Sequence, residues 1–92
     1  MEKILCVVSQ GATREIQGQQ GPSSVVDATL TDGINTFLVS AFDAVAIKMT
    51  NNPLHPGAII NADLEFKVSS SQKDGKNYEW QRVRLRNYGV LM

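Results

Sequence analysis

The sequence predicts an all-β protein, and two observations point to that class. Runs rich in Val, Ile, Leu, Thr and aromatic residues alternate with Gly, Pro, Asn and Asp, which divide the chain into segments of strand length. Only one stretch has the composition and the flanking residues of a helix. The 92 residues are expected to form one domain, 1–92, because a chain this short can build only a single small core.

Five strands are expected, and they cover residues 3–16, 24–31, 36–42, 58–70 and 78–91. Gly11 falls inside the first run, where a glycine indicates a bulge or a bend, as one long strand needs when it takes part in two halves of a barrel. The stretch GQQGPSS is predicted to be a flexible connection. Asp74-Gly75 is a hairpin signal, so the last two strands should be antiparallel neighbours.

The helix is predicted in FDAVAIKMTNN, with Asp43 as its N-cap and an Asn-rich stop before Pro53. The element order is then three strands, a short helix and two more strands. Five strands with one helix between the third and the fourth, in about ninety residues, is the connectivity of the Greek-key barrel called the OB-fold. The sequence therefore predicts a five-stranded OB-fold barrel.

Composition and charge limit the classes of function. Nine Lys and Arg balance nine Asp and Glu, so any affinity for a polyanion must come from a local patch of the surface. The single cysteine, Cys6, has no disulfide partner and is interpreted as a small buried thiol. The apolar run near the N-terminus is too short for a signal peptide or a membrane span, so we expect a cytoplasmic protein with no membrane partner.

The last strand is expected to have two unlike faces. Side chains alternate along a strand, and Val83 and Leu85 are the residues that suit the core. The opposite choice would bury three arginines at a cost of several kcal/mol per ion. The outward positions are then Lys76, Tyr78, Trp80, Arg82, Arg84, Arg86 and Tyr88.

The preceding strand supports the same orientation, because its even positions are apolar. Two carboxylates, Asp63 and Glu65, would share the outer face with the arginines, and cross-strand ion pairs between them would need no ligand. The positions expected inside are Ile60, Ala62, Leu64, Phe66 and Val68.

Two exposed rings beside three arginines suit single-stranded nucleic acid, since rings stack on bases and guanidinium groups hold phosphates. Tyr78 and Trp80 would stack, and the arginines would be extended by Lys73 and Lys76 at the hairpin tip and by Arg14 near the first bend. The alternative is a protein-docking or self-assembly surface made of the same Tyr, Trp and Arg side chains.

The segments NTFLVSAFDAVAIKM and PGAIINADLEFKVSSSQKDGKNYEWQRVRLRN resemble the bacterial and phage single-stranded-DNA-binding protein family. The resemblance covers most of the chain through loose patterns. It implies binding of single-stranded DNA in replication or recombination, with dimers or tetramers as the assembly. The residues that it implicates by position are Lys67, Lys73, Lys76, Tyr78, Trp80, Arg82 and Arg84, with Arg14.

Two features depart from that family. The chain ends RNYGVLM, without a disordered linker and acidic tip, so it is more similar to a core-only phage or plasmid member or to the related primosomal replication protein. Its zero net charge predicts a salt dependence that reflects only a few phosphates. DNA against RNA, the oligomeric state and the pathway are left open.

No catalytic or metal site is predicted. His55, the only histidine, lies between two prolines in NPLHPG and is interpreted as a loop residue. The carboxylates show no spacing that indicates a catalytic pair. We therefore expect no enzyme activity, no cofactor and no small-molecule substrate.

Overall fold

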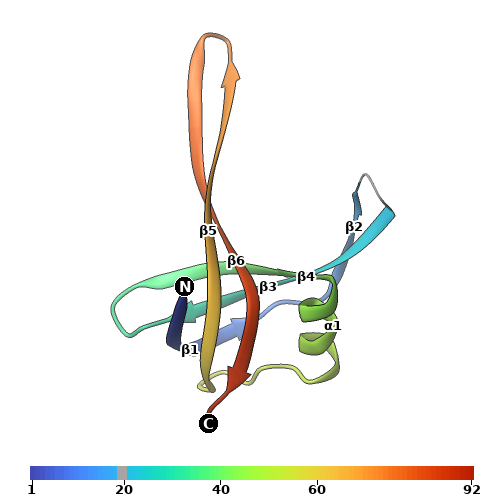
Figure 1. The fold of residues 1–92 in the computed structure, drawn as a ribbon, viewed down its shortest axis with the longest axis vertical. Coiled ribbons are helices and arrows are strands. Elements are labelled where there is room, and N and C mark those ends of the chain that lie inside the picture. Colours follow the sequence, from blue (N-terminus) through green and yellow to red (C-terminus); the bar gives the residue numbers. More distant parts are fainter. Residues whose placement is uncertain (19–20) are drawn as a thin grey trace.

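The computed structural model describes residues 1–18 and 21–92, apart from the side chains of residues 69, 71, 78 and 80. The described chain is mostly β-strand with one short helix, as predicted (Figure 1). The elements are β1 (Glu2–Gln10), β2 (Arg14–Gly18), β3 (Gly21–Thr31), β4 (Thr36–Phe42), α1 (Asp43–Asn51), β5 (Ile59–Lys73) and β6 (Lys76–Val90).

Six strands are described where five were expected, because the first predicted strand is divided at Gly11. The Gly11 N–H donates to the Asp27 carbonyl oxygen at 2.8 Å, and a Cβ on Gly11 would lie 3.1 Å from that same oxygen. This close approach moves the chain out of register between the pairs Gln10–Ala28 and Arg14–Val25. The predicted bend is thus confirmed, and both halves pair with β3.

The hairpin of β2 and β3 also corrects the expected connection at GQQGPSS. Residues 21–24 of that stretch belong to β3, which begins three residues earlier than predicted, and they pair with residues of β2. An extended partner strand supplies the hydrogen bonds that an isolated polar segment lacks. Residues 19–20 lie outside the described chain.

The strands are joined in the order β1-β5-β6-β4-β3-β2, with an additional pairing of β1 with β3. The pairings therefore run in a ring from β1 through β5, β6, β4 and β3 and back to β1. β4 meets β6 in parallel over two register pairs, Val39–Val83 and Ser40–Arg84, and the other pairings are antiparallel. Helix α1 packs against β3, β4 and β6 and buries Ala46 and Met49 (Figure 1).

Asp43 was predicted as the N-cap of the helix, and that prediction is wrong. The N-cap position is Phe42, which is extended and makes no side-chain cap hydrogen bond. Asp43 is the first helical residue and has φ 51°, a left-handed value that Asp tolerates better than most residues. Strand β4 therefore runs directly into α1.

The predicted hairpin turn is confirmed at Asp74-Gly75. Both residues have positive φ, 53° and 73°, which is the requirement of a type I′ turn and the reason that Asp-Gly suits it. The pairings of β5 with β1 end at Asp63 and those of β6 with β4 lie at residues 83–84, so the hairpin beyond them stands away from the body as an arm (Figure 1). We call residues 67–82 the β5–β6 arm.

The arm accounts for the elongated shape of the molecule. The radius of gyration is 14.4 Å, whereas about 12 Å is expected for a compact chain of this length. Phe66 and Val68 were expected inside, but they are 39% and 69% exposed, because Phe66 lies at the base of the arm and Val68 lies on the arm, beyond the core. Phe66 keeps an edge-on contact with Phe37, with ring centroids 6.5 Å apart.

The predicted sidedness of β6 holds from Val83 to Arg86 and then reverses. Leu85 is fully buried and Val83 packs against the core, as predicted. Asp63 pairs with Asn87 and Leu64 pairs with Leu85, so Arg86 is an extra residue in β6, a β-bulge. Tyr88 was expected to face outward, but the bulge turns it inward and leaves it 6% exposed. The Lys48 ammonium group lies 4.2 Å from the centre of its ring.

The core lies inside the ring of strands and under α1. Its largest fully buried side chains include Leu5, Leu30, Met49, Ile60 and Leu64. Cys6 was expected to be buried, but it is only partly so, with its Sγ 3.8 Å from the Val7 carbonyl oxygen. His55 is exposed in the loop before β5, as expected.

Candidate functional site

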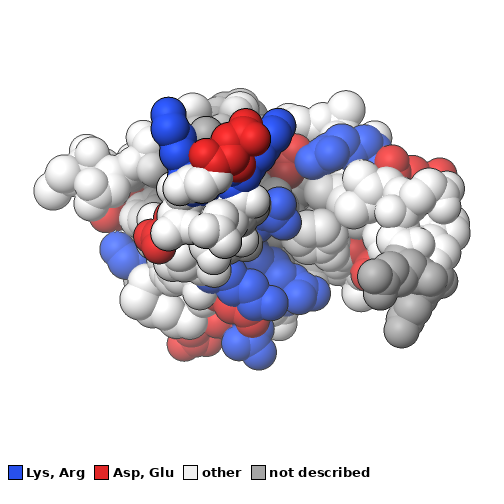
Figure 2. Space-filling view, turned by 90° about the horizontal axis from the view of Figure 1, so that it is seen from above, with Lys and Arg blue, Asp and Glu red and all other residues white. Residues whose placement is uncertain are grey.

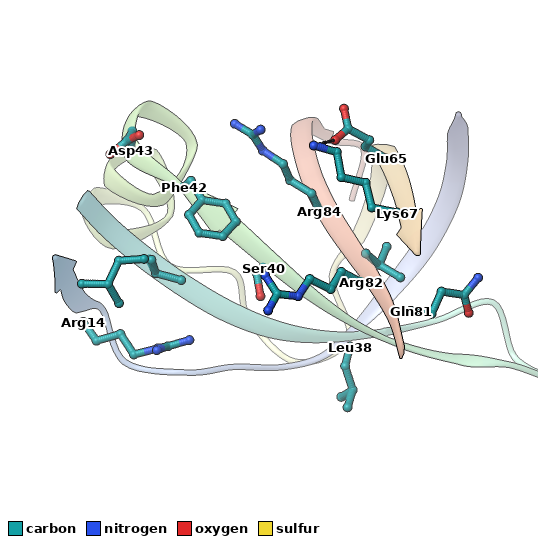
Figure 3. A pocket seen from close by; sticks show the side chains of 13 residues that line it. Arg14, Leu38, Ser40, Phe42, Asp43, Glu65, Lys67, Gln81, Arg82 and Arg84 are labelled. Atoms are coloured by element: carbon teal, nitrogen blue, oxygen red, sulfur yellow. Dashed lines mark ion pairs between the residues drawn. The ribbon is translucent and has the colours of Figure 1, made fainter. Parts of the chain in front are cut away.

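An open groove of about 670 Å³ crosses the outer face of β4 and β6 (Figure 3). Four basic side chains line it, and they come from three strands: Arg14 of β2, Lys67 of β5, and Arg82 and Arg84 of β6. Polar and apolar side chains complete its wall, including Ser40, Gln81, Leu38, Phe42 and Val83. The groove thus combines cations with an aromatic ring.

Strand register brings these residues together. Arg84 lies opposite Glu65 of β5 on one side and Ser40 of β4 on the other, and Arg82 lies opposite Lys67. Across β3, Arg14 is opposite Val25, which is in turn opposite Phe42. Four strand pairings, β2–β3, β3–β4, β4–β6 and β5–β6, are needed before the four cations share one surface, and only β4–β6 joins strands that are not consecutive in the chain.

Phe42 is the groove residue that sequence reasoning missed. The Arg84 guanidinium carbon lies 5.4 Å from the centre of the Phe42 ring, within the range of a cation–π contact (Figure 3). The signal was the alternation in β4, where Val39 and Ala41 are buried while Leu38 and Phe42 line the groove. A half-buried ring beside a guanidinium group can stack on a planar ligand and pair with its charge.

Carboxylates hold part of the basic surface. Arg14 donates to an Asp27 carboxylate oxygen at 2.9 Å, and the Ser40 hydroxyl donates to the other oxygen at 2.7 Å, so Asp27 links β2 to β4. Exposed pairs of this kind contribute about 0–1 kcal/mol, so a ligand can exchange with them at low cost.

The expected pairing of Asp63 and Glu65 with the arginines is found in part. Glu65 lies 3.3 Å from the Lys67 ammonium group and 4.0 Å from Arg86, whereas Asp63 pairs with the N-terminal ammonium group at 3.2 Å. Among the described residues, Arg84 makes no ion pair. Cross-strand ion pairs therefore hold only a part of this face.

The other predicted site residues fall into two groups. Arg86 is exposed but does not line the groove, and Lys73 and Lys76 lie opposite each other at the tip of the arm, also exposed. The backbones of Tyr78 and Trp80 are paired with residues 71 and 69 of β5, but their side chains lie outside the described part of the structure. Their stacking role stays a prediction.

The charge pattern agrees with the neutral composition. Figure 2 shows basic and acidic side chains interspersed on the face from which the arm projects, with no uniformly basic surface. Among the side chains that the structure describes, the two with shifted pKa values are Asp32 and Tyr88, and both lie outside the groove lining. Hydrogen bonds from the backbone N–H groups of Asn35 and Ile34 lower the pKa of Asp32 to about 2, and burial raises the pKa of Tyr88.

Two further expectations concern metals and membranes. Within residues 1–18 and 21–92, no group of three or more His, Cys, Asp or Glu side chains could hold a metal ion. In the same part of the chain, no helix has both the length and the apolar character needed to cross a membrane.

Comparison with known proteins gives a fold relationship. No family model matches the sequence, and no curated protein matches it. The structure is similar to that of a small single-stranded DNA-binding protein from Streptomyces coelicolor, with a TM-score of 0.55 and 17% sequence identity. The match covers 100% of this chain and 94% of the other. The chain therefore shares the overall fold of a small single-stranded DNA-binding protein along its whole length.

Proposed function

We propose that this protein binds single-stranded DNA with little sequence preference, and that its ring of strands is an OB-fold barrel. The observation that carries the proposal is the groove, where Arg14, Lys67, Arg82 and Arg84 line the same surface as Phe42 and Arg84 lies beside its ring. The fold shared with a small single-stranded DNA-binding protein supports it.

The two kinds of side chain have different roles in this proposal. The four cations contact phosphates, which every nucleotide carries. Phe42 stacks on a base, an interaction of about 1–3 kcal/mol that accepts any base because each has a π-face. Tyr78 and Trp80 of the arm add further stacking partners, and Lys73, Lys76 and Arg86 extend the contacts to the backbone of the strand. Binding of this kind follows the polymer's charge and rings and reads little sequence.

The experiment that tests the proposal is a titration of labelled oligo-dT with the protein at low salt, followed by fluorescence anisotropy and by the emission of Trp80. We expect a rise in anisotropy and quenching of the tryptophan, with weaker binding to a duplex of the same length. An RNA oligonucleotide of matched length separates the two polymers. The absence of both signals at micromolar protein would refute the proposal.

A second candidate is docking of a protein partner, or of another copy in a homodimer or homotetramer, on the same face. The observation in its favour is exposed apolar surface beside the cations: Leu38 of the groove is 74% exposed and Val68 of the arm is 69% exposed. Sedimentation of wild type and Trp80→Ala separates the candidates. Loss of an oligomer with unchanged DNA affinity would favour docking, whereas loss of DNA affinity with an unchanged assembly favours the groove. A role in replication or recombination, in the cytoplasm, belongs to the DNA proposal.

A further inference from the structure

Glu65 is a carboxylate placed among the cations of the groove. It lines the groove on β5, one of its oxygens lies 3.3 Å from the Lys67 ammonium group, and the other lies 4.0 Å from Nε of Arg86. Arg84 lies directly across from it on β6. A single negative charge thus adjoins three of the basic residues that the proposed ligand would meet.

The three side chains of this ion-pair cluster differ in their access to solvent. The Glu65 side chain is 29% exposed, whereas those of Lys67 and Arg86 are 66% and 55% exposed. An approaching phosphate therefore meets the cations before it meets the carboxylate. The cations can turn from Glu65 to the phosphate, but Glu65 cannot leave the surface.

The hydrogen bonding of Glu65 is incomplete even in the free protein. Its Oε1 atom is buried and has no hydrogen-bond partner among the residues that the structure describes, although Lys67 lies within ion-pair distance. A half-buried carboxylate in this state depends on its cations for stabilisation. Moving Lys67 or Arg86 onto a ligand leaves Glu65 less well compensated, and this opposes binding.

We infer that Glu65 is an affinity-determining residue that competes with nucleic-acid phosphates for Lys67 and Arg86. The inference rests on the proposed function of the groove. DNA binding then exchanges ion pairs within the protein for ion pairs with the ligand. The wild-type chain consequently binds more weakly, and with a shallower salt dependence, than its number of basic residues would give.

The test is oligo-dT binding by wild type and Glu65→Gln over a range of salt concentrations, with Asp63→Asn as the matched control. Both variants raise the net charge by one, on the same face of the same strand, but Asp63 pairs with the N-terminus rather than with Lys67 or Arg86. At low salt, removing a unit charge a few Å from one or two phosphates should tighten binding by Glu65→Gln about three- to tenfold. The slope of log K against log salt should steepen by about 0.7 for each additional phosphate contact.

Competition between Glu65 and phosphate also predicts how a substitution of Arg86 behaves. Arg86→Gln should weaken binding more in the Glu65→Gln background than in wild type, because there Arg86 reaches the ligand without giving up an ion pair with Glu65. If thermal melting shows that Glu65→Gln is not folded, Glu65→Thr is used in its place, because threonine suits a strand.

Each outcome is decisive. Equal tightening by Glu65→Gln and Asp63→Asn, or no tightening by Glu65→Gln, would overturn the competition while leaving DNA binding itself intact. Weaker binding by Glu65→Gln would show that the carboxylate orients its cations for the ligand, and would also overturn the inference. Absence of binding by wild type and by every variant would refute the proposed function as well.

Discussion

The sharpest difference that the structure makes to the proposed interface lies between two arginines of one strand. Arg84 lines the groove beside Phe42, whereas Arg86 is the bulged residue of β6, lies outside the groove lining and is held by Glu65. The sequence pattern gave both the same role. We predict that Arg84→Gln weakens binding to oligo-dT far more than Arg86→Gln does.

The magnitude follows from what each side chain would lose. A hydrogen bond to a charged group is worth about 1.5–3 kcal/mol, and because Arg84 is exposed we take the lower end, which corresponds to about a tenfold loss of affinity. One phosphate contact fewer should also reduce the salt slope by about 0.7. Arg86→Gln should change affinity by less than about twofold, because Arg86 lies outside the groove lining and must give up its ion pair with Glu65 to reach a phosphate.

The assay is anisotropy of a labelled oligo-dT at four or more salt concentrations, with circular dichroism to show that both variants are folded. The two substitutions remove the same charge from the same strand, so general electrostatics cannot separate them. Equal losses for both variants would refute the assignment of the groove as the binding surface. A larger loss for Arg86→Gln would move the interface to the other side of Glu65.

Further predictions concern the ring, the core and one carboxylate. Phe42→Leu should weaken oligo-dT binding about tenfold with an unchanged salt slope, because it removes stacking and no charge; a change in slope would contradict that role. Leu85→Ala should lower the free energy of unfolding by about 2–5 kcal/mol in urea titrations, since the side chain is fully buried, whereas Val68→Ala on the arm should cost less than about 0.5 kcal/mol. Similar losses in the two would mean that the arm is packed. The pKa of Asp32, about 2, lies below the ordinary 3.8, so its ionised form stabilises the fold above pH 3.8 and this contribution is lost as the pH falls through 2. The stability difference between wild type and Asp32→Ala should therefore shrink between pH 6 and pH 2, and a carboxyl titration near pH 4 by NMR would contradict the shift.

Sequence patterns predicted the elements well where neighbouring residues alone decide the structure. Asp74-Gly75 supplies the two positive φ values of its turn, and the alternation through Val83 and Leu85 fixes which side of β6 meets the core. The division at Gly11 was also visible as a bend, although its consequence, two strands on one partner, was not.

Alternation failed at the places where pairing between distant segments decides the outcome. The rule that side chains alternate between the two faces of a strand holds only where the strand pairing has no bulge. The extra residue at Arg86 therefore reversed the face of Tyr88. Alternation also carries no information on where the core ends, which is why Val68 was expected inside. Within the site, Phe42 was missed because alternation places it on the face opposite Val39 and Ala41 but does not show whether other strands cover that face.

The β5–β6 arm is held by the pairing of its own two strands and by the Asp74-Gly75 turn. The core of the protein lies outside the arm (Figure 1). The reach of the arm can therefore vary in steps of two residues per strand without disturbing the packing of the domain, since each such step preserves which side chains face the same way. Shortened or lengthened versions would form a molecular ruler: the number of nucleotides occluded by one copy should change with arm length while the melting temperature of the body stays constant.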